Sequence, residues 1–401
     1  MTQNLLFNIG EMFKGLWEQM GIANGVWQNY VMLLISFVLF YLAIVKKFEP
    51  LLLLPIAFGM FIVNVPGAYD IVWGTYPEGV AHTYENVQNR GLLWYLFYGV
   101  DKVIYPPLIF LGIGAMTDFG PLISNPKSMF IGAAAQLGIF VALFLAICLG
   151  FDLAAACSIA IIGGADGPTA IYVTQWMSKY TSEDLLSAIA IAAYSYMALV
   201  PIVQPPVIRA LTTTHERRIR MPYHQHTVSR RTKILFPIII TAVCGIVSPR
   251  SVALVGFLMF GNLIRVCGVL DSLSETAQKT LSNLITLFLG LTIAVRMQAE
   301  YFLTKQTLLI MALGLVAFMF DTAGGVLVAK LINLFLPKEK KLNPMIGACG
   351  ISAFPMSARV VYKMAIKEDP QNYLLMQCVG VNVSGQVASV IAGGLLLNLL
   401  V

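Results

Sequence analysis

A single carboxylate lies within one of the most apolar parts of this 401-residue chain. The segment IIGGADGPTAIY, residues 161–172, contains Asp166, and between Lys127 and Lys179 the only other charged residue is Asp152. Three glycines and a proline, residue types that interrupt a regular helix, surround the carboxylate: Gly163, Gly164, Gly167 and Pro168. Freed backbone carbonyls and one carboxylate are what a small hard cation binds. The segment therefore predicts a cation site centred on Asp166; the alternative is a kinked helix in which Asp166 caps a half-helix or pairs with a distant arginine.

A second interrupted segment offers oxygen ligands without a matching acid. The stretch LNPMIGACGISAFPMSARVV, residues 342–361, contains Asn343, Gly347, Ser352 and Arg359. Asn343 and Ser352 can complete a cation shell around the acid of the first segment. Arg359 is a fixed cation whose natural partner is an anion, either a carboxylate substrate or a nearby acid. The alternative for Arg359 is a side chain that snorkels to the membrane interface.

Each interrupted segment is followed by an apolar run that carries polar side chains. In the first run Tyr194 and Tyr196 are two residues apart, so a regular helix turns at most one of them toward the site. In the second run Asn382, Gln386 and Ser389 recur at i, i+4 and i+7 and form one polar stripe, which can bind a cation or simply join helices by hydrogen bonds. Two interrupted segments at corresponding positions of two halves are typical of a transporter's binding site, and we interpret the halves as an inverted repeat.

The composition identifies the class of protein. Hydrophobic residues make up 58% of the chain and charged residues 11%, with a mean hydropathy of +0.78, whereas soluble proteins carry about 25% charged residues. The apolar runs are continuous and lack the alternation of a membrane barrel, so we expect an all-α polytopic membrane protein with about ten or eleven transmembrane segments. The run over residues 306–335 can hold two elements. Asp321, near one expected end of a span, favours a structural role.

Six expected regions follow from these runs and from the charges. They are an N-terminal interfacial segment (1–29), scaffold-like membrane segments (30–127), a first core repeat (128–213), a basic cytoplasmic loop (214–233), connecting membrane segments (234–305) and a second core repeat (306–401). Residues 215–233 hold six Lys or Arg against one Glu, which places this loop in the cytoplasm, while the more acidic loop 64–90 is expected outside. A nucleic-acid partner is not expected, and no N-terminal signal peptide is evident.

The cysteines and histidines give no sign of a metal centre. All six cysteines fall in apolar runs without a CxxC pair, which fits neither a disulfide framework nor a zinc site. His215, His224 and His226 share the basic loop, and we interpret them as exposed loop histidines.

Four motifs, in order along the chain, closely resemble the membrane β subunit of the biotin-dependent, sodium-pumping decarboxylases of oxaloacetate, methylmalonyl-CoA, glutaconyl-CoA and malonate. They are PPLIFLGIGAMTDFGPLI (106–123), IIGGADGPTAIY (161–172), YSYMALVPIVQPP (194–206) and NPMIGACGISAFPMSARV (343–360). The resemblance covers most of the chain from about residue 30. It leaves residues 1–30 and 64–92 without a matching motif.

The resemblance implies a subunit that decarboxylates carboxybiotin, exports Na+ across the cytoplasmic membrane of a prokaryote and consumes a proton. It implies Na+ and a biotin carried by a partner protein rather than by this chain. The implied partners are a biotin carrier subunit, a carboxyltransferase α subunit and a small membrane subunit of the γ/δ type, with the β subunits forming a homotrimer. The acyl substrate of the complex does not follow, because this subunit does not touch it.

The resemblance also assigns roles to individual residues. Asp166 matches the central Na+ ligand, which can alternate between Na+ and H+. Asn343, Gly347 and Ser352 match further site residues, and Arg359 matches a functionally important arginine. Of the two tyrosines in YSYM we favour Tyr196 over Tyr194 as the proton-handling residue, and we add Asn382 of the polar stripe as a Na+ ligand.

Two functions from other classes remain open on the residues alone. A sodium-coupled secondary transporter of small carboxylates would have the same broken helices and the same buried acid. A membrane scaffold without transport would leave the buried acid and arginine unexplained. A biotinylated partner distinguishes the decarboxylase from the transporter, because the transporter needs none.

Overall fold

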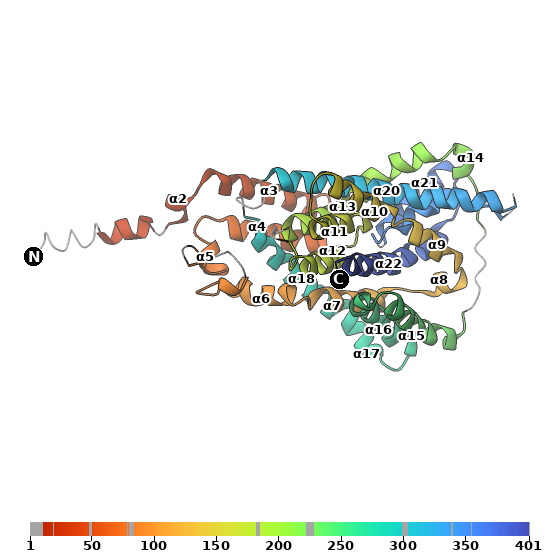
Figure 1. Ribbon diagram of the computed structural model, residues 1–401, viewed down its shortest axis with the longest axis horizontal. Coiled ribbons are helices and arrows are strands. Elements are labelled where there is room, and N and C mark those ends of the chain that lie inside the picture. The colour runs from red at the N-terminus through yellow and green to blue at the C-terminus, as the bar shows by residue number, and fades with distance from the viewer. Residues whose placement is uncertain are drawn as a thin grey trace, which may run out of the picture. The chain divides into compact units, whose positions relative to one another are not determined.

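The computed structural model of the chain describes residues 11–18, 20–47, 50–77, 79, 84–181, 185–221, 228–298, 304–337, 340–353 and 355–400. The described residues fold into helices joined by short connections and form no strand, apart from one isolated bridge between Thr75 and Gln88 (Figure 1). The all-α class predicted from the continuous apolar runs is confirmed. His224 and His226 of the basic loop lie outside the described residues.

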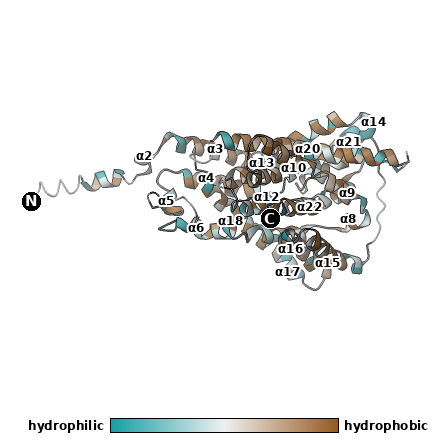
Figure 2. Ribbon diagram, in the orientation of Figure 1, coloured by the Kyte–Doolittle hydropathy of each residue, from teal (hydrophilic) through white to brown (hydrophobic). Residues whose placement is uncertain are grey.

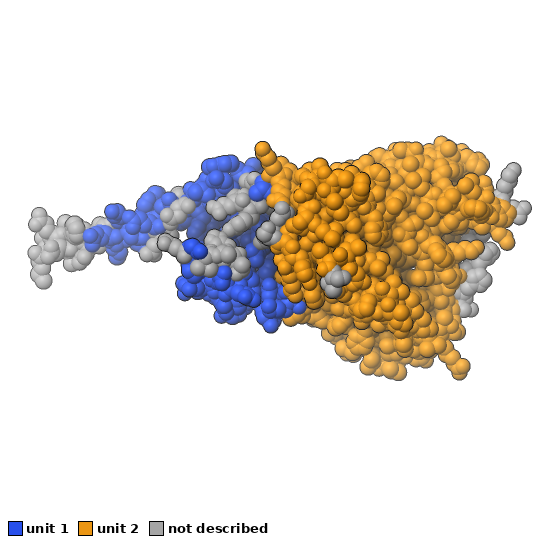
Figure 3. Space-filling view, viewed as in Figure 1, with its two compact units in different colours: residues 1–102, 286–304 blue, residues 103–285, 305–401 orange. Residues whose placement is uncertain are grey.

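The chain forms two compact units, Met1–Lys102 with Thr286–Thr304 and Val103–Ile285 with Lys305–Val401 (Figure 3). In the first unit α3 (Trp27–Ile44) packs along α4 (Pro50–Asn64). The other elements of this unit are α2 (Gly21–Asn24), α5 (Tyr69–Val72), η1 (Tyr84–Asn86), α6 (Leu92–Asp101), the C-terminal part of α18 (Ser282–Ile293) and η5 (Ala294–Arg296).

A small aromatic core joins α6 to the loop over residues 64–90, which the sequence predicts to lie outside the membrane. The rings of Tyr84 and Trp94 stack with centroids 4.5 Å apart, and Trp73 meets Phe97 edge-on at 5.4 Å. The Arg90 guanidinium lies 3.9 Å from the Trp94 ring, a cation–π geometry. Aromatic stacking thus gives this loop contacts of its own.

The second unit contains both interrupted segments. Its first half runs α7 (Tyr105–Met116), α8 (Gly120–Ser124), α9 (Lys127–Ala134), α10 (Leu137–Cys148), α11 (Leu153–Ala160), η2 (Ile161–Gly164), α12 (Gly167–Met177), α13 (Leu186–Leu211) and α14 (Thr214–Arg217). Then come α15 (Arg230–Val247), η3 (Pro249–Ser251), α16 (Val252–Cys267), α17 (Asp271–Thr276), η4 (Ala277–Leu281), α20 (Lys305–Phe335), η7 (Pro344–Gly350), α21 (Met356–Glu368) and α22 (Leu375–Asn398).

Six described helical stretches are long and apolar enough to cross a membrane, or up to eight if each of two bent helix pairs forms one span. Hydrophobic residues dominate these helices (Figure 2). Two further apolar helices, Pro50–Asn64 and Leu153–Gly164, are shorter than these stretches. The number of described long apolar stretches is therefore smaller than the ten or eleven crossings expected from sequence. The polytopic class is therefore confirmed, while the inverted repeat stays a prediction.

The run over residues 306–335 is one helix rather than two elements. α20 is 31 residues long and contains no proline, so nothing in its backbone forces a break. Asp321 consequently lies at its middle and is fully buried, not near the end of a span as the sequence suggested. Its Oδ1 accepts the backbone N–H of Ile139, 3.2 Å away in the first turn of α10. Asp321 thus caps a half-helix, because the span Lys127–Cys148 is interrupted at residues 135–136.

Candidate functional site

Asp166 lies where the first interrupted segment changes direction. The 3₁₀ turn η2 ends at Gly164 and is followed by Ala165, a non-glycine residue in the left-handed region with φ of 50°. Asp166 is then the N-cap of α12. Its Oδ1 accepts the backbone N–H of Thr169 at 3.2 Å, and its Oδ2 accepts the Thr169 hydroxyl at 2.7 Å. The broken backbone therefore aims the carboxylate, and the capping role considered from the sequence is present as well.

A chain of hydroxyl groups joins Asp166 to the second interrupted segment. The Ser389 hydroxyl, from α22, donates to Asp166 Oδ2 at 3.0 Å, and it lies 2.6 Å from the hydroxyl of Ser352. The backbone N–H of Ser352 donates to the carbonyl of Gly164 at 3.0 Å. The structure thus brings Asp166 and Ser352 together through Ser389. We call Asp166, Thr169, Ser352 and Ser389 the Asp166 cluster.

The charge of the Asp166 cluster suits a cation. Asp166 is 7% exposed, and in the described part of the chain no lysine, arginine or histidine forms an ion pair with it. The pairing with a distant arginine that the sequence left open is therefore not observed there. The three hydroxyls of the cluster can rotate, so each can donate to the carboxylate or present a lone pair to a cation. One negative charge with several oxygen atoms in a site nearly closed to water is the chemistry of a monovalent hard cation.

Carboxamide side chains support the C-terminal end of η7 and the residue that follows it. Asn382 Nδ2 donates to the carbonyls of Cys349 and Ile351 at 3.1 and 2.7 Å, and Gln136 Nε2 donates to that of Gly350 at 3.0 Å. From α13, Gln204 Nε2 donates to the carbonyl of Ala348 at 2.8 Å. Irregular backbone at membrane depth requires such partners, because no water satisfies it there.

The oxygen atoms of these carboxamides have no hydrogen-bond donor among the described residues. This holds for the side-chain oxygens of Asn382, Gln136 and Gln204, and also for that of Gln386, one turn along α22 from Asn382. All four side chains are buried. Buried acceptors without donors are costly in a protein interior, so those that lie beside the Asp166 cluster are candidates for holding a cation.

The two tyrosines of YSYM point to different neighbours. A Cβ placed on Gly167 would lie 2.0 Å from Cε1 of Tyr194, so the Tyr194 ring packs directly on the residue after Asp166. The Tyr196 hydroxyl instead donates to the carbonyl of Met311 on α20. The structure therefore brings Tyr194, rather than Tyr196, beside the Asp166 segment.

Asn343 and Gly347 have contacts of another kind. Asn343 Nδ2 donates to the carbonyls of Arg217 and Ile219, at 2.8 and 2.9 Å, and its Oδ1 accepts the N–H of Met345. A Cβ on Gly347 would lie 2.1 Å from the carbonyl oxygen of Gly325, so this glycine allows η7 to approach α20. In the described contacts Asn343 anchors the basic loop, and none joins it to the Asp166 cluster.

Arg359 lies on α21 with an exposed side chain, nine residues before Glu368. At the other end of α21 acids hold the basic loop: Arg217 pairs with Glu368 at 2.8 Å, and Arg220 pairs with Asp369 at 2.6 Å. The hydrogen bonds from Arg220 hold the pKa of the Asp369 carboxyl below its usual range. Arg359 forms no ion pair with the residues that the structure describes, so its exposed guanidinium can meet an anion that approaches α21 or reach the membrane interface.

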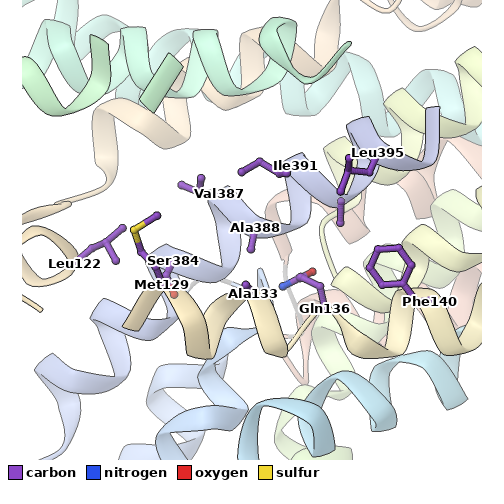
Figure 4. A pocket seen from close by; sticks show the side chains of 11 residues that line it. Leu122, Met129, Ala133, Gln136, Phe140, Ser384, Val387, Ala388, Ile391 and Leu395 are labelled. Atoms are coloured by element: carbon purple, nitrogen blue, oxygen red, sulfur yellow. The ribbon is translucent and has the colours of Figure 1, made fainter. Parts of the chain in front are cut away.

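A groove of about 210 Å³ lies along the surface where α9 and α10 meet α22 (Figure 4). Its walls are apolar except for Gln136 and Ser384. Gln136 projects from the break between α9 and α10 toward α22, between Ala133 and Phe140 (Figure 4).

Sequence reasoning did not select Gln136 or Thr169. Thr169 could have been found from the Asp-x-x-Thr pattern of a helix cap. The sequence signal at Gln136 is weaker, because this residue is marked only by being polar within an apolar run.

The chain is similar over nearly its whole length to known decarboxylase subunits. Residues 28–400 match the family described as the Na+-transporting oxaloacetate decarboxylase beta subunit. The chain is 50% identical over 380 residues to the methylmalonyl-CoA decarboxylase subunit beta of Propionigenium modestum, covering 92% of this chain and 94% of that protein. It is 46% identical to the glutaconyl-CoA decarboxylase subunit beta of Acidaminococcus fermentans, covering 95% of each chain, and 43% identical to the oxaloacetate decarboxylase beta chain of Haemophilus ducreyi, covering 97% and 98%.

Proposed function

The chain belongs to the family of β subunits of Na+-transporting decarboxylases, and we propose that it cleaves carboxybiotin and couples this cleavage to Na+ export. The observation that carries the proposal is the Asp166 cluster, in which one buried carboxylate, with no cationic partner among the described residues, meets hydroxyls from three segments. A carboxylate at this depth costs several kcal/mol unless an ion or a proton neutralises it. Na+ and H+ are then alternative occupants of Asp166.

The proposed site residues follow the contacts. Asp166 supplies the charge, Thr169, Ser352 and Ser389 supply hydroxyl oxygens, and Asn382 offers the carboxamide oxygen that lacks a donor. We assign Asn343 and Gly347 to the position of η7 rather than to the cation shell, because their contacts are with the basic loop and α20.

The chemical step requires one proton. When carboxybiotin loses CO₂, the bond between the carboxyl carbon and the ureido nitrogen breaks, and the electron pair left on nitrogen takes up a proton to give biotin. A site that excludes water favours this step, because the carboxylate loses the hydration that stabilises it before cleavage. We propose that Arg359 neutralises the incoming carboxylate and that Tyr194, packed beside Asp166, handles the proton, with Tyr196 as the alternative.

Transport follows from exchange at Asp166. Na+ enters and neutralises Asp166; after CO₂ is released, a proton replaces Na+ so that the site returns uncharged. Moving one charge against the membrane potential costs about 2.3 kcal/mol per 100 mV, so cleavage has to be coupled tightly to ion movement.

In this proposal the biotin is attached to a carrier subunit. A carboxyltransferase α subunit loads it, a small γ/δ-type membrane subunit completes the complex, and β subunits form a trimer in the cytoplasmic membrane of a prokaryote.

The unit boundaries extend this proposal to the architecture. We propose that the second unit, which contains both interrupted segments, includes the moving core, and that the N-terminal membrane segments act as its scaffold. The two core repeats would then be residues 128–213 and 306–401, with 234–305 connecting them and residues 1–29 at the interface.

The proposal is tested with the chain and its partner subunits in liposomes, by measuring CO₂ release from a carboxylated biotin carrier with and without Na+. Na+-stimulated release supports the decarboxylase pump. No release, together with Na+-driven uptake of a free carboxylate, would instead establish a secondary transporter of small carboxylates. Purification of the chain from its own cells adds a second readout, since only the pump should bring a biotinylated protein with it.

A further inference from the structure

The side chain of Gln136 is fixed in one orientation. It is 3% exposed and lies at the break between α9 and α10. Its Nε2 donates to the carbonyl of Gly350 at 3.0 Å and to that of Gly132 at 3.2 Å. Both donor hydrogens are therefore in use, and the carboxamide cannot flip without losing them. The oxygen of the same group must point away from these two carbonyls.

The side-chain oxygen of Gln136, Oε1, points toward the first interrupted segment. A Cβ built on Gly164 would lie 3.5 Å from Gln136 Oε1 and 3.4 Å from Cβ of Ser389, the residue whose hydroxyl donates to Asp166. Gly164 has no side chain, so no atom of that residue fills this position. Gln136 Oε1 and Cβ of Ser389 consequently lie beside the same open position at Gly164, next to the Ile139 side chain.

The oxygen is an acceptor without a donor. Gln136 Oε1 is buried and has no hydrogen-bond partner among the residues described. A buried carboxamide oxygen with no donor, held in place by its own amide hydrogens, is well placed to bind a cation. The Asp166 cluster, which supplies one carboxylate and three hydroxyls, leaves room for further neutral oxygen ligands.

We propose that Gln136 is a further ligand of the monovalent cation held by Asp166 and sets the preference of the site for Na+. Interruptions of three helical segments, at residues 135–136, 161–166 and 350–353, then meet around one ion. This inference rests on the proposed function, because it takes Na+ as the ion at Asp166. It adds a residue that neither the sequence motifs nor the polar stripe of α22 identify.

Gln204 provides a matched control. Its Nε2 donates to the carbonyl of Ala348, in the same stretch of η7, and its Oε1 also lacks a donor among the described residues. It is fully buried, as Gln136 is nearly so, but it belongs to α13 and no described contact joins it to Gly164 or Ser389. Replacing either glutamine with leucine removes one support of η7, whereas only one of the two replacements removes an oxygen from the cation.

The test is Na+ binding to the purified full chain, measured by titration calorimetry and by the rise in unfolding temperature on adding Na+, with Li+ and K+ for comparison. We expect Gln136→Leu to weaken Na+ binding by about tenfold, the scale of one lost bond to a charged group, and to reduce the preference for Na+ over K+. Gln204→Leu should lower the unfolding temperature of the Na+-free protein to a similar extent and keep the wild-type Na+ affinity.

Equal losses of Na+ affinity in the two variants would overturn the proposal, because the effect would then come from η7. Wild-type affinity and selectivity in Gln136→Leu would overturn it as well. If Gln136→Leu does not fold, Gln136→Glu keeps the oxygen and adds a charge, so it should bind Na+ more tightly than wild type; unchanged affinity in that variant would contradict the inference. A wild-type chain that binds no Na+ would instead contradict the proposed function.

Discussion

The backbone N–H of Ser352 lies 3.0 Å from the carbonyl oxygen of Gly164, so one hydrogen bond joins the two interrupted segments. The residues are 188 positions apart in the chain (352 minus 164). Each segment has unwound backbone that needs partners, and each supplies one to the other. This crossing places Ser352 next to Ser389 and, through it, next to Asp166. A shift of either segment therefore changes the surroundings of the carboxylate.

Ser389→Ala should weaken the response to Na+. The variant removes the hydroxyl that donates to Asp166 Oδ2, a bond to a charged group whose loss amounts to about 1.5–3 kcal/mol, or roughly tenfold or more in affinity. The Na+ concentration that half-stimulates CO₂ release measures this change. Ser158→Ala is the matched control, because the Ser158 hydroxyl is buried and donates only to the Ala154 carbonyl of its own helix. Equal shifts in both variants would argue against a role for Ser389 at the cation.

Substitutions at Ala165 should report the strain beside Asp166. Ala165 has a φ of 50°, a conformation that costs a non-glycine residue about 1–2 kcal/mol and a β-branched residue more. Ala165→Gly should therefore fold with little change in unfolding temperature, since relief of strain offsets the entropy of glycine. Ala165→Val should lower the unfolding temperature markedly. If valine is tolerated as well as glycine, the turn does not have this conformation in the membrane.

Replacing Tyr194 and replacing Tyr196 should have different effects on turnover and on stability. Tyr194→Phe should lower the rate of carboxybiotin cleavage by about a hundredfold, the lower range for loss of a proton-transfer group, with little change in stability. Tyr196→Phe removes a hydroxyl that donates to the Met311 carbonyl and should cost about 1 kcal/mol of stability while turnover continues. Turnover and unfolding temperature are measured on the same preparations. The reverse pattern would make Tyr196 the proton-handling residue.

Asn343→Ala should loosen the basic loop. The Asn343 carboxamide holds the carbonyls of Arg217 and Ile219, so its loss exposes the peptide bonds after Arg217, Arg218 and Arg220. Trypsin should cut there several times faster than in wild type. Ser352→Ala, which lies in the Asp166 cluster, should alter the Na+ dependence of turnover and leave the rate of cutting unchanged. If Asn343→Ala changes the Na+ affinity but is not cut faster by trypsin, Asn343 is a ligand of the cation rather than an anchor of the loop.

The interrupted segments could be predicted because they depend on local chemistry. Gly163 and Gly164 weaken a helix and Pro168 favours the first turn of a new one, whatever surrounds them. A carboxylate within an apolar run also needs a partner. The polar stripe of α22 followed from helical periodicity, and Ser389 proved to face Asp166. The interruption at Asp166 and the hydrogen bond from Ser389 are both present among the described residues.

The remaining parts of the site depend on tertiary contacts that no local pattern carries. Asn343 and Ser352 belong to one motif, yet η7 separates them and carries Asn343 to the basic loop. A period of 3.6 residues shows that Tyr194 and Tyr196 diverge, but not which one meets Gly167. Gln136 is a lone polar residue in an apolar run, and its importance appears only when Gly164 and Gly350 lie beside it.

The most direct test of the account counts Na+ and CO₂ in the same liposomes. The chain with its partner subunits is supplied with carboxylated biotin carrier, and radioactive Na+ uptake and CO₂ release are recorded together for wild type, Asp166→Asn and Asp152→Asn. Asp152 also caps a helix, accepting the Ala155 N–H at 2.7 Å, but it is exposed. We expect Asp166→Asn to lose both activities and Asp152→Asn to keep both. Na+-stimulated CO₂ release that persists in Asp166→Asn would contradict the central role of Asp166.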